Sequence, residues 1–131
     1  GPGNHGTTFG GGPLAMRAGL ETLKIIEAEG LMANATEQGD RIRAGLKEQL
    51  GTLPGVREIR GRGLMIGLEL ERPCGELVKS ALDAGLLINV THDNVIRLLP
   101  PLVISRSEAD LIVERLAPLV VRFLAAPAKA A

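Results

Sequence analysis

The stretch VREIRGRGLMIGLEL, residues 56–70, decides the fold. Apolar side chains occupy every second position from Leu64 to Leu70, which predicts a half-buried strand. A shorter strand is predicted over residues 56–60, and the glycine-rich residues 61–63 between the two strands are typical of a turn. A dinucleotide-binding loop is not expected here, because its glycines have another spacing and lead into a helix.

Helices and strands alternate on the carboxyl-terminal side of this segment. A helix with one apolar side is followed by two short strands, which the polar turn THDN joins, and then by a longer helix. The predicted elements are a helix over 75–84 closed by Gly85, strands over 86–90 and 95–98, and a helix over 108–124.

Either of two serines can cap this last helix, because a serine hydroxyl accepts a hydrogen bond from a free amide of the first turn. Ser105 is one candidate. Ser107 is the other, and it has an acidic residue, Asp110, at the third position that a capping box requires. An aspartate there replaces the preferred glutamate or glutamine.

Two further helices are expected on the amino-terminal side. Apolar residues recur at helical spacing from Pro13 to about Glu29, where Gly30 ends the pattern, and again from Leu31 to Leu50. The second of these helices has a charged side opposite its apolar side. Helices that alternate with strands without a strict repeat predict an α+β domain, in which a small sheet has helices on one face.

The composition is that of an ordinary globular protein and excludes several classes of partner. The 131 residues, 45% of them hydrophobic, allow a modest core. The 15 basic and 15 acidic residues balance, so neither nucleic acid nor an anionic membrane is an expected partner. No membrane span or secretory signal is expected, because the longest apolar stretch is interrupted by Pro118 and Arg122 and the first residues lack a basic and an apolar region.

Nucleophiles and metal ligands are sparse. Cys74 is the single cysteine, which agrees with a reducing, cytoplasmic location, and a small buried side chain is its expected role. His5 adjoins a threonine-rich loop and His92 lies in a turn, and neither is expected to act as a general base. No His, Cys, Asp and Glu have the spacing of a metal site.

Residues 4–15, NHGTTFGGGPLA, carry the first chemical signal. The glycines at 10–12 let the backbone approach a ligand closely, and Pro13 fits the first position of a helix. A helix start that follows Thr7 and Thr8 is a candidate anion site, because free amides and the helix dipole favour negative charge, and phosphate is the natural ligand. A plain loop with an N-cap is the alternative interpretation.

This loop resembles the cofactor-phosphate loop of the class III, ornithine-type aminotransferases, which use pyridoxal 5′-phosphate. The family pattern is HG[ST][TS][FY]GGNPLA, so Gly12 stands where the family usually has Asn. Residues 61–70, GRGLMIGLEL, and 86–105, LLINVTHDNVIRLLPPLVIS, resemble later segments of the same family. The resemblance implies that Thr8 and Thr7 hydrogen-bond the cofactor phosphate across the interface of a homodimer.

Arg97 is the second chemical signal, because it is the lone charge in the apolar run of residues 95–104. A guanidinium keeps its charge, and its paired donors fit a carboxylate. From the residues alone, an exposed strand arginine or a structural ion pair remains an alternative. The resemblance implies a binding role, since Arg97 matches the family arginine that holds the α-carboxylate of the amino-acid substrate.

The resemblance also implies a part that is not in this sequence. In the family, the lysine that forms a Schiff base with the cofactor precedes the threonine loop. None of the lysines of the chain matches it: Lys24, Lys47, Lys79 and Lys129. No residue here is therefore expected to be catalytic, and the chain alone is expected to be inactive.

The resemblance therefore implies a C-terminal fragment of a fold-type I transferase. Residues 1–30 are expected to close the large cofactor-binding domain, and residues 31–131 to form a small α+β domain with a mostly antiparallel sheet. The implied reaction moves the terminal amino group of an ornithine-like substrate, N2-acetylornithine, to 2-oxoglutarate in arginine biosynthesis. Ornithine, succinylornithine and 4-aminobutyrate are alternative amino donors, and a non-catalytic binding or assembly domain is the alternative from another class.

Overall fold

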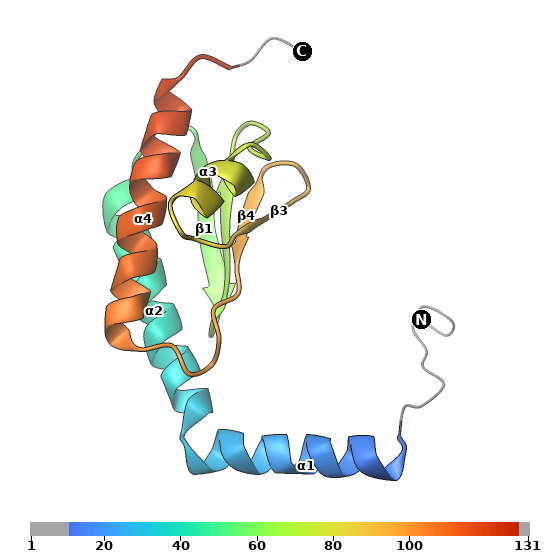
Figure 1. Cartoon of the computed structure of the whole chain (residues 1–131). Coiled ribbons are helices and arrows are strands. Elements are labelled where there is room, and N and C mark those ends of the chain that lie inside the picture. Colours follow the sequence, from blue (N-terminus) through green and yellow to red (C-terminus); the bar gives the residue numbers. More distant parts are fainter. Residues whose placement is uncertain (1–10, 129–131) are drawn as a thin grey trace.

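Within residues 11–128, the part of the chain that the computed structural model describes, four helices and four strands follow one another (Figure 1). The predicted α+β class is confirmed. In chain order the elements are α1 (Pro13–Ala28), α2 (Leu31–Leu50), β1 (Val56–Arg62), β2 (Met65–Leu70), α3 (Leu77–Asp83), β3 (Asn89–Thr91), β4 (Val95–Leu98) and α4 (Arg106–Ala125).

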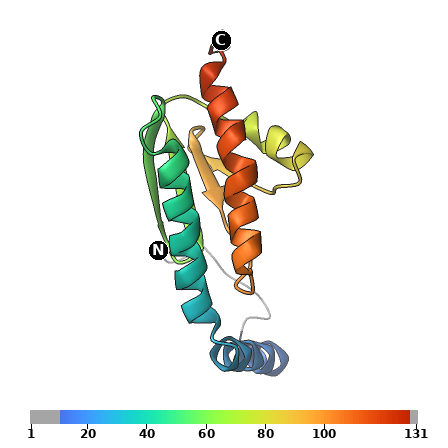
Figure 2. The ribbon, with the colours of Figure 1, turned by 90° about the vertical axis from the view of Figure 1, so that its left-hand side faces the viewer.

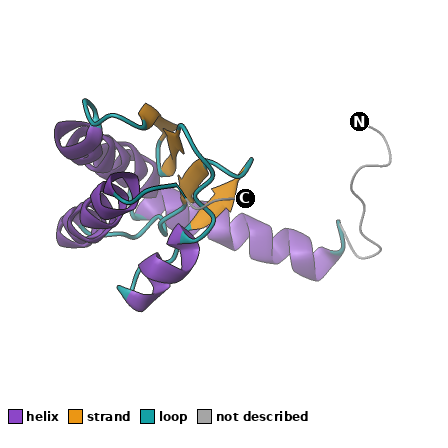
Figure 3. Cartoon of the chain, turned by 90° about the horizontal axis from the view of Figure 1, so that it is seen from above, coloured by secondary structure: helices purple, strands orange, loops and turns teal. Residues whose placement is uncertain are grey.

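The strands form one sheet in the order β1-β2-β4-β3, and each neighbouring pair is antiparallel. Helices α2 and α4 lie side by side along one face of this sheet (Figure 2). Seen from above, α2, α3 and α4 gather on one side of the strands, while α1 extends away from them (Figure 3). The prediction of helices packed on one face of a small antiparallel sheet is therefore confirmed.

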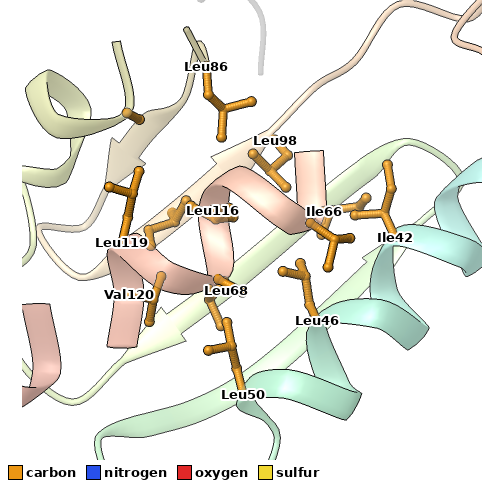
Figure 4. Packing of buried hydrophobic residues seen from close by; sticks show 14 of the residues in the cluster. Ile42, Leu46, Leu50, Ile66, Leu68, Leu86, Leu98, Leu116, Leu119 and Val120 are labelled. Carbon is orange, nitrogen blue, oxygen red and sulfur yellow. The ribbon is translucent and has the colours of Figure 1, made fainter. Parts of the chain in front are cut away.

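The hydrophobic core fills the space between the sheet and these helices (Figure 4). It follows from the predicted alternation in β2, since Ile66, Leu68 and Leu70 are buried whereas Met65 is exposed. Burial of an aliphatic side chain of this size contributes about 1.5–3 kcal/mol to folding. The remaining elements add Ile96 and Leu98 from β4, Ile42, Leu46 and Leu50 from α2, and Leu116, Leu119 and Val120 from α4.

Helix α2 also contacts the turn between β1 and β2. A Cβ atom at Gly39 would stand 1.9 Å from the carbonyl oxygen of Gly63 in this turn. One helical turn further on, Arg43 donates a hydrogen bond of 2.8 Å from Nη1 to the same oxygen. The missing side chain at Gly39 therefore sets how closely the helix approaches the hairpin.

Strand β1 is longer than predicted. It continues through Gly61 and Arg62, which pair with β2, so the turn is confined to Gly63 and Leu64. The prediction of a turn over residues 61–63 is wrong for residues 61 and 62, which belong to the strand. A glycine in a strand still forms its backbone pairing although it has no side chain to pack.

Helix α3 is shorter than the predicted range 75–84, and its apolar side is narrower. Leu77 and Ala81 are buried, whereas Val78 and Leu82, expected on the same side, are exposed. Residues four apart lie on one row of a helix, and a helix of seven residues presents one such row to its neighbour.

Strand β3 covers Asn89–Thr91 rather than the predicted range 86–90. Its ladder with β4 has three pairs, so the preceding apolar residues have no strand partner there. Leu86 is buried in the core and donates its backbone N–H to the carbonyl oxygen of Ala81, at 2.8 Å. This bond, together with the positive φ of Gly85 (+78°), closes α3 as predicted.

Of the two predicted caps of α4, Ser105 is confirmed, and its capping-box partner is Glu108; the alternative pair of Ser107 and Asp110 is not found. The Glu108 backbone N–H donates to the Ser105 hydroxyl at 3.1 Å, and the Ser105 backbone N–H donates to the Glu108 carboxylate at 3.0 Å. These hydrogen bonds hold the pKa of Glu108 below its usual range. Ser107 cannot serve as the cap because the helix begins before it, at Arg106.

Helix α1 differs from the other elements because none of its residues is buried. Leu14 and Leu23 are 85% and 60% exposed, so the apolar side predicted from the sequence lies uncovered. The helix ends before Gly30, whose φ of +63° lets the chain turn into α2, and the two axes run in different directions (Figure 1). This arrangement agrees with the predicted boundary after residue 30, which stays a prediction.

Candidate functional site

The amino-terminal loop that the sequence predicts to bind phosphate lies only partly within the described residues. Thr7, Thr8 and His5 lie outside the described residues, while Gly11 and Gly12 lead into α1. Gly11 has a φ of +81°, and a Cβ there would meet no atom of the described chain within 4 Å. The N-cap residue of α1, Gly12, has no side chain that could cap the helix, and no acid stands in its first turn. Among the described residues, this helix start is therefore electrostatically suited to an anion.

Arg97 lies in the middle of the sheet, on the face that α2 and α4 leave uncovered. On β4 it stands opposite Gly67 of β2 on one side and Asn89 of β3 on the other. Its side chain is exposed, and within residues 11–128 no carboxylate or other acceptor pairs with it. The predicted alternative of a structural ion pair is therefore not found among the described residues.

A shallow hollow of about 480 Å³ surrounds Arg97. Gly67 forms its floor, because this residue lies between Arg97 and Arg60 in one row across three strands. A Cβ at Gly67 would touch Arg60 Cγ and Val95 Cγ1 at 3.7 Å. His92, from the turn after β3, lines the edge of the hollow. The glycine therefore leaves an open space between two guanidinium groups.

The acids on this face are paired with other arginines. Arg60 Nη1 lies 3.0 Å from Glu58 Oε2 and 3.3 Å from Glu69 Oε2. Arg57 Nη1 lies 3.9 Å from Glu69 Oε1. Because these acids pair with other arginines, the charge of Arg97 has no acidic partner among residues 11–128, and its paired donors have the geometry that suits a carboxylate.

The other candidate side chains take no part in this hollow or only border it. Cys74 is fully buried, as predicted, and burial raises the pKa of its thiol. His92 is exposed and has a φ of 50°, which places it in the tight turn predicted for it. Among residues 11–128, no group of His, Cys, Asp and Glu could hold a metal ion, and no helix combines the length and apolar character of a membrane span.

The sequence alone does not identify Gly67, Arg60 and Glu69 as neighbours of Arg97. The alternation in residues 64–70 places Gly67 and Glu69 on the polar face of their strand. The missing information is the strand order and register, which bring β1, β2 and β4 together in this row.

The amino-acid sequence matches one protein family over most of its length. The family described as aminotransferase class-III matches residues 1–120. Acetylornithine aminotransferase 1 of Bordetella bronchiseptica is 60% identical over 124 residues, which are 95% of this chain and 32% of that protein. The acetylornithine aminotransferase of Nitrosomonas europaea is 49% identical over 123 residues, 94% of this chain and 31% of that protein.

The fold matches solved structures of the same kind. The ornithine aminotransferase of Toxoplasma gondii, described with PLP at partial occupancy in its active site, matches with a TM-score of 0.82 and 33% identity. The match covers 93% of this chain and 30% of that chain. The present chain therefore spans about a third of the length of the proteins that it resembles.

Proposed function

The chain belongs to the class-III aminotransferase family, and we propose that it forms the carboxyl-terminal third of an acetylornithine aminotransferase that depends on pyridoxal 5′-phosphate. The reaction proposed is the transfer of the terminal amino group of N2-acetylornithine to 2-oxoglutarate, as a step of arginine biosynthesis. The single observation that carries the role of this chain is Arg97, which is exposed in a hollow and has no acidic partner among residues 11–128.

Arg97 is proposed to bind the carboxylate of the amino-acid substrate and, in the second half of the reaction, that of 2-oxoglutarate. Its guanidinium stays charged at any physiological pH, and two parallel N–H donors fix the orientation of a carboxylate. A substrate held at one end presents its other end in a defined position, which favours reaction at the terminal amino group. Arg97 is thus a binding residue that orients the substrate.

The start of α1 is proposed to hold the phosphate of the cofactor. Pyridoxal 5′-phosphate supplies the electron-withdrawing group that amino transfer requires. The helix start, with its positive φ at Gly11 and its lack of a first-turn acid, fits a phosphate group. Thr7 and Thr8 are proposed to add hydroxyl hydrogen bonds from the preceding loop.

The lysine that bonds to the cofactor is proposed to lie in the part of the enzyme that precedes these residues. Lys24, Lys47 and Lys79 are all exposed on helices rather than gathered near the hollow of Arg97. The residues 1–131 are therefore proposed to be inactive alone. The uncovered α1 supports the proposal that residues 1–30 belong to the large domain. A homodimer and a cytoplasmic location complete this proposal, and the single, buried Cys74 agrees with the latter.

The experiment that tests the proposal compares amino donors on the full-length enzyme. The kcat/KM should be measured with 2-oxoglutarate as acceptor and with N2-acetylornithine, ornithine, succinylornithine or 4-aminobutyrate as donor. We expect the highest value for N2-acetylornithine. A higher value for ornithine, the substrate in the name of the Toxoplasma gondii relative, would move the assignment to that donor. No transfer from any donor would favour the non-catalytic binding domain.

A further inference from the structure

Glu69 is the acid that lies nearest to Arg97 in the strand register. On β2 it follows Gly67, which is the direct partner of Arg97, by two positions, so both side chains project from the same face. Its own partner on β4 is Val95, two positions before Arg97. Diagonal neighbours of this kind are about 7–8 Å apart, a gap that two long charged side chains can bridge.

The structure nevertheless shows Glu69 turned to the opposite side, toward β1. Its Oε2 lies 3.3 Å from Arg60 Nη1, and its Oε1 lies 3.9 Å from Arg57 Nη1. The Glu69 side chain is only 20% exposed, whereas Arg60 is 44% exposed. A carboxylate with so little contact with water needs a cation beside it, and β1 supplies two.

The position of Arg60 serves a second acid at the same time. Glu58 and Glu69 stand directly opposite each other on β1 and β2, and like charges in that arrangement destabilise a sheet. The same Arg60 nitrogen donates to both carboxylates, at 3.0 and 3.3 Å. Arg60 thus binds both Glu58 and Glu69 on the β1 side of Gly67, away from Arg97 on β4.

We infer that Arg60 is a positioning residue, which holds Glu69 away from Arg97 so that Arg97 stays open to the carboxylate of the substrate. This inference rests on the proposed function of Arg97. Without Arg60, Glu69 is free to pair with Arg97 across the diagonal, and the substrate carboxylate then has to displace an internal one. Arg60 makes no contact with the substrate in this scheme and acts on affinity through Glu69.

The test is a double-mutant cycle on the full-length enzyme with its cofactor. The dissociation constant of glutarate, which has two carboxylates and no reactive carbonyl, is measured together with the KM for 2-oxoglutarate. Arg60→Ala should weaken glutarate binding about five-fold, because exposed ion pairs are worth about 1 kcal/mol at most and a ten-fold change corresponds to 1.4 kcal/mol. Glu69→Gln added to Arg60→Ala should restore most of the lost affinity.

Arg62→Ala is the matched control. The substitution removes the same charge from the same strand and the same hollow, but Arg62 forms no ion pair among residues 11–128. It should weaken glutarate binding less than Arg60→Ala, and Glu69→Gln should not correct that loss. Equal losses for Arg60→Ala and Arg62→Ala, or no recovery in Arg60→Ala/Glu69→Gln, would overturn the inference.

Two further measurements separate this inference from its alternatives. Arg60→Ala should weaken glutarate binding in the parent but not in an Arg97→Ala background, because the effect acts through Arg97, so an equal loss in both backgrounds would show a merely structural role. Arg97→Ala should weaken glutarate binding in every background. If Arg97→Ala leaves glutarate binding unchanged, the proposed function of Arg97 itself fails. If Arg97→Ala weakens glutarate binding and Arg60→Ala does not, only the role of Arg60 fails.

Discussion

Gly39 of α2 and the carbonyl oxygen of Gly63 are so close that a methyl group cannot stand between them. A Cβ at position 39 would lie 1.9 Å from that oxygen. Both partners are backbone, so neither can move aside as a flexible side chain could. The contact joins α2 to the β1–β2 hairpin, which carries Gly67 and Glu69.

Gly39→Ala is therefore expected to destabilise the chain. In an exposed helix, this substitution would be favourable by about 1 kcal/mol, whereas a forced overlap in a packed contact costs about 1–3 kcal/mol. The free energy of unfolding in urea measures the balance. Gly19→Ala in α1 is the control, because a Cβ there meets no atom within 4 Å, and it should not destabilise. A Gly39→Ala chain as stable as the parent would contradict the packing of α2.

Ser105→Ala should lower the free energy of unfolding by about 1 kcal/mol, since it removes the hydroxyl that caps α4. Ser107→Ala is the comparison, because Ser107 lies inside the helix and accepts no first-turn amide. Chemical denaturation of the two variants should show the larger loss for position 105. A larger loss for position 107 would favour the other candidate from the sequence, a cap at Ser107 paired with Asp110.

The ion pair between Arg41 and Asp110 should make stability depend on pH in acid. Arg41 Nε and Nη2 donate to the two carboxylate oxygens at 2.5 and 2.9 Å, which lowers the pKa of Asp110. The ion pair stabilises the fold fully at a pH above the pKa of Asp110 in the unfolded chain, about 3.9. This stabilisation is lost as the pH falls through the lower pKa of Asp110 in the folded chain. Asp110→Asn should therefore be less stable than the parent at neutral pH, and the difference should vanish in acid.

Arg41→Gln provides the matching measurement for that pair. It removes the donor instead of the acceptor, so its difference in stability from the parent should close over the same acidic range. Both partners are partly exposed, at 36% and 47%, so the effect at neutral pH is small. A difference that persists unchanged at a pH well below the unfolded value of about 3.9 would show that the loss comes from packing rather than from charge.

Cys74 should react slowly with a thiol reagent while the chain is folded. The side chain is fully buried, and the raised pKa reduces the fraction of the reactive thiolate. The rate of modification by a disulfide reagent, followed with increasing urea, should rise through the unfolding transition. Rapid modification without denaturant would mean that the segment between β2 and α3 opens on its own.

Arg97→Ala in the full-length enzyme should raise the KM for both the amino acid and 2-oxoglutarate by about ten- to one-hundred-fold, because hydrogen bonds to a charged group contribute about 1.5–3 kcal/mol. Arg97→Lys keeps the charge but loses the paired donors, so its KM values should lie between those of the parent enzyme and those of Arg97→Ala. Steady-state kinetics with each substrate varied in turn measures both values. An unchanged KM would remove Arg97 from the binding site.

The sequence predicts the elements of this fold better than their limits. The alternation in residues 64–70 and the helical spacing of 31–50 each follow from one buried face, and both elements are found there. The start of strand β3 is predicted too early because Leu86 is buried in the core without having a strand partner. An apolar residue signals burial, but it does not say against which element it is buried.

The candidate site divides in the same way. Arg97 stands out as a lone charge in an apolar run, so its exposure on a strand could be anticipated. Its relation to Gly67 and Arg60 could not, because it depends on which strands are neighbours and in what register. Residues far apart along the chain become a row only when the sheet is assembled.

The bare surface of α1 has a consequence for how this part of the protein gains its shape. A helix of 16 residues without a packed side is only marginally stable in water, because its backbone hydrogen bonds barely outweigh the entropy lost in forming them. Its amide hydrogens should therefore exchange with solvent long before those of α2 and α4. Amide hydrogen exchange in α1 then reports whether the helix is packed against the rest of the protein, because it should slow only when another surface covers Leu14, Leu20 and Leu23.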